Sequence, residues 1–118
     1  MLSRSAFRPR HQNSGKADAS RRCSAHLTWV RGRDCALADK GDCEGRIEAA
    51  HADAAGGKGM GIKVADAYVL PLCSRHHSLS HSLGRKTFEA RFGINMVEAS
   101  KAYAKASPHW ARLMEMLS

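Results

Sequence analysis

The pattern of apolar and polar positions predicts a chain that starts polar and then alternates short helices and strands. Residues 1 to about 22 show no apolar period and are rich in serine and arginine, which is typical of a disordered segment. Leu27 and Val30 have helical spacing, and they predict a short helix over residues 25–33 that turns both side chains inward. The ordered part of the chain is therefore expected to start near residue 23.

The middle of the chain contains two strand-like segments on either side of a glycine-rich loop. Residues 46–51 and 67–70 have the character of short strands, and the second is expected to stop at Pro71. The loop over residues 54–61 has unusual backbone freedom because of Gly56, Gly57, Gly59 and Gly61. Two strands joined in this way predict an open hairpin.

A helical pattern follows Pro71 and continues, with interruptions, to the end of the chain. Ser74 is the predicted N-cap of the first helix, and Gly84 is expected to end it after Leu83. Further apolar positions have helical spacing interrupted by Pro108 and are expected to be core: Phe88, Phe92, Val97, Ala104, Trp110, Leu113, Met114 and Leu117. These elements predict an α+β fold with a strand–strand–helix core at about residues 35–84 and C-terminal helices over 85–118.

The length of the chain bounds its organisation and its compartment. A chain of 118 residues fits one domain, expected over residues 23–118 behind an N-terminal arm of residues 1–22. No apolar run is long enough to span a bilayer, and the N-terminus lacks the apolar stretch of a secretory signal. The expected compartment is a reducing cytoplasm, where the four cysteines favour metal ligation over disulfides.

The positive charge is concentrated near the N-terminus. Residues 1–33 contain eight Lys or Arg side chains and one acidic residue, Asp18, so this stretch carries +7 of the formal charge of +8. A basic arm on a nearly neutral body suits contact with nucleic-acid phosphates. A solvated tail that only aids solubility is an equally good interpretation of the composition.

Cysteine and histidine gather between residues 35 and 81. Cys73 and His76 are three residues apart in the first turn of the predicted helix, where they lie on one face and can share an ion. Cys35 and Cys43, separated by a loop, would complete a tetrahedral zinc site. The alternative is a set of free buried cysteines. Cys23 lies at the edge of the basic arm and is expected to be unliganded.

A second group of histidines has a different spacing. His77 and His81 are four residues apart, so they project from the same side of the helix and can chelate one divalent cation. The alternative is a pair of solvated surface histidines. His51 ends the first strand, and its neutral imidazole could remove a proton from water near neutral pH, although an isolated histidine is often structural. If the strand continues, Asp53 lies on the same face as His51 and could bind metal or orient an imidazole. The alternative is that Asp53 lies in a loop.

An ordered string of these residues resembles the HNH endonuclease superfamily, and more closely the phage and prophage recombination-enhancement (Ref-like) HNH nucleases. The similarity covers about residues 26–92. The matching segments are residues 26–31, 48–51 and 59–63, then Asp66, residues 69–77 and His81. The resemblance implies a ββα-metal fold, in which two strands and a helix clamp one catalytic cation.

The resemblance also implies roles for individual residues. His51 matches the general base, Asp66 falls near the central Asn or Asp that orients the base, and His77 and His81 match ligands of the catalytic ion. That ion could be Mg²⁺, Mn²⁺, Ni²⁺ or Zn²⁺. The ligands implied for a structural Zn²⁺ are Cys35, Cys43, Cys73 and His76. The sequence therefore resembles a DNA endonuclease that hydrolyses phosphodiester bonds with one catalytic metal and a histidine base.

One position departs from the family pattern. Many HNH sites have a ligating Asp or His directly before the base, where this chain has Ala50. Either Asp53, water or the phosphate completes the metal shell, or His51 is itself a ligand. The departure keeps open the alternative of a non-catalytic, zinc-stabilised DNA-binding or recombination accessory module.

The implied partner is DNA, together with a recombinase or another phage DNA-processing protein. Lys58 and Lys63 on the glycine-rich connection, and Arg75 on the helix, are candidate phosphate contacts, although each could equally be a solvated charge. A third, weaker interpretation is a protein-interaction domain that docks through the apolar stripe of residues 110–117.

Overall fold

The computed structural model describes residues 22–55 and 65–117, which form a small α+β unit with five α-helices and a two-stranded antiparallel sheet. No helix within these ranges is long and apolar enough to cross a membrane. The elements are α2 (Ser24–Arg31), a 3₁₀ turn (Ala38–Lys40), β1 (Ile47–His51), a second 3₁₀ turn (Asp53–Ala55), β2 (Val69–Cys73), α3 (Ser74–Leu83), α4 (Arg85–Phe92), α5 (Met96–Ala106) and α6 (Trp110–Leu117).

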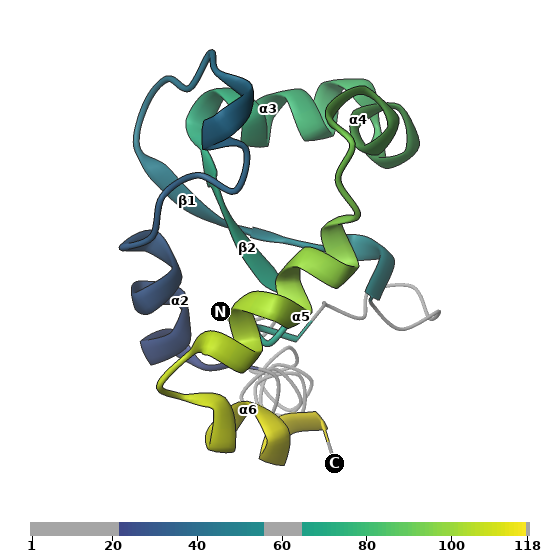
Figure 1. The fold of residues 1–118 in the computed structure, drawn as a ribbon. Helices are drawn as coiled ribbons and strands as arrows, with labels where there is room; N and C mark the ends of the chain where they lie inside the picture. Colours follow the sequence, from purple (N-terminus) through teal and green to yellow (C-terminus); the bar gives the residue numbers. More distant parts are fainter. Residues whose placement is uncertain (1–21, 56–64, 118) are drawn as a thin grey trace, which may run out of the picture.

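The two strands cross the middle of the molecule and the helices surround them (Figure 1). α3 and α4 lie on one side, α5 runs past β2, and α6 lies at the end remote from α3. β1 pairs with β2 in a register that opposes Ala50 to Leu70 and His51 to Val69. Both expected hairpin strands are therefore present, the first at residues 47–51 and the second at 69–73 instead of 67–70. The expected loop between them falls largely on residues outside the described ranges.

β2 does not stop at Pro71, contrary to the prediction, but continues to Cys73. The Pro71 carbonyl points away from β1 and accepts a hydrogen bond from the Ala36 N–H at 2.8 Å. In a strand, the nitrogen and the carbonyl of one residue face the same side, so the nitrogen of Pro71 also faces away from β1. Because no ladder hydrogen bond is needed there, proline is compatible with the strand.

The helix predicted after this strand has the expected end but a different cap. α3 ends at Leu83, and Gly84 follows with a φ of 84°, as expected for the residue that terminates it. The N-cap is Cys73 and not Ser74, because the Cys73 side chain accepts a hydrogen bond from the His76 N–H. One residue therefore ends the strand, caps the helix and presents a sulfur atom.

The main core joins the sheet to the helices that follow it. Ala50 of β1, Leu70 and Leu72 of β2, Phe88 of α4 and Met96 of α5 belong to one buried cluster. A smaller cluster fixes the C-terminal end and consists of Cys23, Ala67, Ala104 and Leu113. Of the apolar positions predicted to be core in the C-terminal helices, Phe88, Ala104 and Leu113 are buried. Leu117 at the end of α6 is 40% exposed.

The inner face of α2 differs in part from the expected one. Val30 is fully buried, but Leu27 is only partly buried, and His26 takes the other interior position. The His26 Nδ1 pairs with the Ser107 hydroxyl at 2.9 Å, which links α2 to the turn between α5 and α6. Burial and the neighbouring His109 lower the pKa of His26, so its ring is neutral at physiological pH.

Gly45, which leads into β1, is required by its surroundings, and we expect Gly45→Ala to destabilise the fold. Its φ is 84°, and an added Cβ would lie 2.6 Å from the Ser74 hydroxyl oxygen and 2.7 Å from the Ser74 Cβ. The left-handed backbone alone costs about 1–2 kcal/mol, and the collision adds about 1–3 kcal/mol. The free energy of unfolding, from urea titration, measures the sum.

Gly93→Ala is the matched control. Gly93 has a φ of 62° but open space around the position of a Cβ. This variant should therefore lose only the backbone part of the free energy. Equal losses for the two variants would show that Ser74 moves aside without cost.

Candidate functional site

Three sulfur atoms surround one imidazole nitrogen at the start of α3. The His76 Nδ1 lies 3.6 Å from the Cys35 Sγ, 3.7 Å from the Cys43 Sγ and 3.1 Å from the Cys73 Sγ. The four ligand atoms all lie within 4.8 Å of one another. A single ring nitrogen can pair with one thiol by hydrogen bonding, so the convergence of three sulfurs exceeds what hydrogen bonds explain.

The distances fit a tetrahedral ion. Zinc–sulfur bonds of about 2.3 Å and zinc–nitrogen bonds of about 2.0–2.1 Å place sulfur and nitrogen about 3.6 Å apart at tetrahedral angles. Two of the three measured separations agree closely with this value, and the Cys73 separation is shorter. The set Cys35, Cys43, Cys73 and His76 can thus hold a metal ion such as zinc, as the sequence predicted.

The surrounding backbone prepares these side chains for ligation. The Cys35 Sγ accepts hydrogen bonds from the backbone N–H groups of Leu37 and Cys73, which fix the position of the sulfur. Burial lowers the pKa of His76, so its ring is neutral and can donate a lone pair. Desolvation and the neighbouring thiols raise the pKa of Cys43 to about 12. A cation that neutralises their charge is therefore needed before all three sulfurs ionise.

The next turn of α3 carries a pair of histidines, His77 and His81. The Nε2 atoms of His77 and His81 lie 3.3 Å apart, and the two ring centroids are 5.0 Å apart. A tetrahedral ion with metal–nitrogen bonds of about 2.0–2.1 Å would place its nitrogen ligands about 3.3–3.4 Å apart. The i, i+4 spacing therefore brings the two rings to a separation that suits chelation of one ion.

Glu48, which the sequence did not indicate as a functional residue, orients this pair. Its carboxylate Oε1 accepts a hydrogen bond from the His77 Nδ1 at 2.6 Å. With the proton on Nδ1, the Nε2 of a neutral His77 carries the lone pair that faces His81. The hydrogen bond from His77 outweighs the effect of burial and lowers the pKa of Glu48, so its carboxylate is charged at neutral pH. A carboxylate behind an imidazole is the usual support of a histidine metal ligand.

His51 belongs to a different pair. Its Nε2 lies 3.0 Å from the Asp66 Oδ1, and the Asp66 Oδ2 accepts the Cys23 N–H at 2.8 Å. Asp66 is 2% exposed. Burial acts to raise its pKa, but the hydrogen bonds from His51 and from the backbone of Cys23 keep the pKa below the ordinary value. A charged Asp66 therefore holds the proton of His51 on Nε2 and leaves the lone pair on Nδ1.

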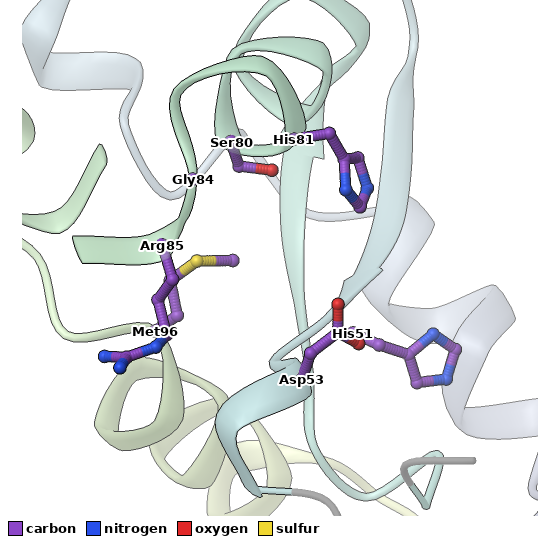
Figure 2. A pocket seen from close by; sticks show the side chains of 7 residues that line it. All are labelled: His51, Asp53, Ser80, His81, Gly84, Arg85 and Met96. Atoms are coloured by element: carbon purple, nitrogen blue, oxygen red, sulfur yellow. The ribbon is translucent and has the colours of Figure 1, made fainter. Parts of the chain in front are cut away.

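A hollow of about 180 Å³ lies between the His51–Asp66 pair and the His77–His81 pair (Figure 2). His51, Asp53, His81 and Arg85 are among the residues that line it. Figure 2 shows the His81 ring reaching into the hollow from α3, and the His51 ring turned outward at the end of β1. The donor atoms of His51, His77 and His81 do not gather into one ligand group. Among the described residues the only group of three or more is the cysteine–histidine cluster. Asp53 lies in a 3₁₀ turn and does not extend the strand.

The chain was compared with known proteins. A family model described as "Protein of unknown function (DUF968)" matches residues 15–107. The chain belongs to this family. No curated protein and no solved structure matches it. For this DUF968 chain, function has to be argued from the site.

The sequence also singled out three candidate phosphate contacts and one cysteine outside the zinc site in this DUF968 chain. Arg75 is exposed on α3, which leaves its predicted phosphate contact untested. Lys58 and Lys63 lie outside the described residues. Cys23 is buried, and its sulfur is not part of the metal cluster. Its backbone, however, helps to hold Asp66 and therefore contributes to the position of His51.

Proposed function

We propose that the protein is an HNH-type endonuclease, a metal-dependent phosphodiester hydrolase acting on DNA in phage or prophage recombination or DNA processing. One observation carries the proposal: a histidine suited to act as a base and a histidine suited to bind metal line the same hollow, His51 and His81. The order of strand, strand and helix, with the resemblance of residues 48–81 to HNH nucleases, supports it. The Cys₃His cluster would hold a structural zinc ion.

The proposed chemistry starts with a proton transfer to His51. Asp66 fixes the ring with its proton on Nε2, so Nδ1 is the atom that accepts a proton from water. The oxygen of that water forms a bond to phosphorus as the bond from phosphorus to the 3′ oxygen breaks. The proton moves to Nδ1, and Asp66 stabilises the imidazolium. The pairing with Asp66 supports the role of base for His51, because a buried carboxylate stabilises the imidazolium that forms.

His77 and His81 would hold the divalent cation, with Glu48 keeping His77 in the tautomer that can ligate. When bound, this ion supplies positive charge that stabilises the phosphate and the departing oxygen in the transition state. Two side chains from one helix leave the rest of the coordination shell to water and phosphate. Ala50 is compatible with such an open site.

Nicking of supercoiled plasmid, with single-stranded DNA as a second substrate, tests the proposal. The zinc-loaded protein should cut DNA only after addition of Mg²⁺, Mn²⁺, Ni²⁺ or further Zn²⁺. No cleavage with any of these ions would contradict it. The outcome would then favour a zinc-stabilised DNA-binding module, to which Ala50 and the single ligand group of the described residues also point. Metal analysis separates the two: the module binds one tight zinc, and the nuclease binds a second, exchangeable ion.

Replacing Glu48 by alanine should weaken binding of the exchangeable ion about 10–100-fold. Without the carboxylate, the His77 ring loses its fixed orientation and its preferred tautomer. Isothermal titration of Mn²⁺ or Ni²⁺ into the zinc-loaded protein measures this affinity independently of cleavage. Glu98→Ala is the control, because Glu98 lies on α5, is exposed, and its carboxylate pairs with Lys101 of the same helix. An unchanged affinity for Glu48→Ala would exclude the proposed role.

A further inference from the structure

A second hollow, of about 370 Å³, lies beside His77 along the first half of β1. Its lining consists of Arg31, Arg46, Ile47, Glu48, Ala49 and His77. Three of these residues are consecutive in β1, whose single partner in the sheet is β2. The floor of the hollow is therefore the outer edge of β1, and one wall is a proposed metal ligand.

The pairing register decides which backbone groups face this edge. Ala49 lies opposite Pro71, and the Pro71 carbonyl points away from β1 toward Ala36. In an antiparallel pair, the backbone N–H and C=O groups of two directly opposed residues either all point toward the partner strand or all point away from it. The N–H of Ala49 therefore points outward into the hollow, where an edge strand leaves such groups unpaired.

The side chains of the hollow add positive charge. Arg31 at the end of α2 and Arg46 just before β1 are both exposed, and neither guanidinium has a hydrogen bond or ion pair within the described ranges. The carboxylate of Glu48 already accepts hydrogen bonds from His77 and Ser74. Arg46 is close enough to Glu48 to help lower the pKa of that carboxyl, but its guanidinium donates no hydrogen bond to it. Two guanidinium groups with unused donors and an outward backbone N–H form a donor set that suits a phosphate group.

We infer that this hollow binds a phosphate of the DNA backbone that flanks the cleaved phosphate, held by Arg31, Arg46 and the Ala49 N–H. The inference rests on the proposed function. A DNA strand would follow the outer edge of β1 from Arg46 toward His51. Ala49 and His51 are two residues apart, about 7 Å along a strand, a step comparable to that between successive phosphates of an extended nucleic-acid strand. The site positions substrate by charge.

Fluorescence anisotropy of labelled single- and double-stranded DNA over a salt series tests the site. All proteins carry His51→Ala, so that the DNA stays intact, and all are zinc-loaded. The test variant adds Arg31→Gln and Arg46→Gln. The control adds Lys86→Gln and Arg112→Gln, which remove the same charge from exposed positions that line neither hollow.

The test variant should bind DNA about tenfold more weakly per arginine at low salt. The slope of log affinity against log salt should fall by about 1.4–1.8 in magnitude, the change expected for two lost phosphate contacts. The control should change less in both quantities. Equal behaviour of the two variants overturns the inference. It is also overturned if, with RNA of the same sequence as a further probe, the test variant loses affinity for the RNA and not for the DNA.

The nuclease proposal can fail separately. If the protein cuts no DNA with any divalent ion, yet Arg31 and Arg46 carry the salt-dependent binding, the phosphate site stands and the hydrolase proposal does not. If the protein cuts DNA and the double variant binds as the control does, the hydrolase proposal stands and this site is overturned.

Discussion

Replacing His51 by alanine is expected to slow divalent-dependent DNA cleavage by about 10²–10⁴-fold, the range that a positioned general base contributes. The variant removes the only imidazole held by a buried carboxylate in the described residues, and leaves His77 and His81 untouched. Zinc content and affinity for the proposed exchangeable ion should stay unchanged, because His51 belongs neither to the cysteine–histidine cluster nor to the His77–His81 pair.

Initial rates of plasmid nicking at saturating divalent ion measure the loss, alongside zinc content and the thermal midpoint. His109→Ala is the control, since it removes an imidazole from the turn between α5 and α6, outside both hollows. Full cleavage by His51→Ala would show that another group takes the proton. A loss of the exchangeable ion in this variant would instead assign His51 to the metal shell, the alternative that Ala50 raised in the sequence.

The parts of the site that the sequence predicted are those fixed by local geometry. Cys73 with His76, and His77 with His81, are three and four residues apart, and a helix brings such positions onto one side whatever surrounds it. The C-terminal end of α3 followed from Gly84, whereas its N-cap is Cys73 and not the predicted Ser74. These two pairs could therefore be placed on α3 before the tertiary structure was known, whereas Cys35 and Cys43, which are distant in the chain, were added from the zinc-ligand pattern and the family resemblance.

The parts that escaped prediction depend on pairing across the chain. Glu48 meets His77 only because the register of β1 on β2 places Glu48 opposite Leu72, close to the start of α3. Pro71 continues the strand because its nitrogen faces the edge covered by Ala36, which no local pattern reveals. A carboxylate three residues before the candidate base was a pattern that could have indicated Glu48, since it lies on the strand predicted to pair with the one that leads into the histidine-bearing helix.

Replacing Cys73 by alanine is expected to unfold the domain at neutral pH, the largest effect of any single substitution considered. Structural zinc contributes about 10–16 kcal/mol in small modules, which equals or exceeds the total stability of about 5–15 kcal/mol typical of a domain. Cys73 is also the N-cap of α3, and its backbone N–H donates to the Cys35 sulfur. Its loss therefore removes an ion ligand and a helix cap at the point where β2 meets α3.

Cys23→Ala is the matched control because Cys23 is also buried but lies outside the cluster. It should keep its zinc and lose about 1 kcal/mol, a value typical of point substitutions. Far-ultraviolet circular dichroism, with zinc content measured on the same samples, follows both variants. In the proposed function, the first turn of α3 carries two ligands of the structural cluster and its next turn would hold the exchangeable ion, so Cys73→Ala should lose fold and cleavage together. His51→Ala should lose cleavage alone. A Cys73→Ala protein that stays folded without zinc would show that apolar packing of Leu70, Leu72 and Phe88 suffices to hold α3.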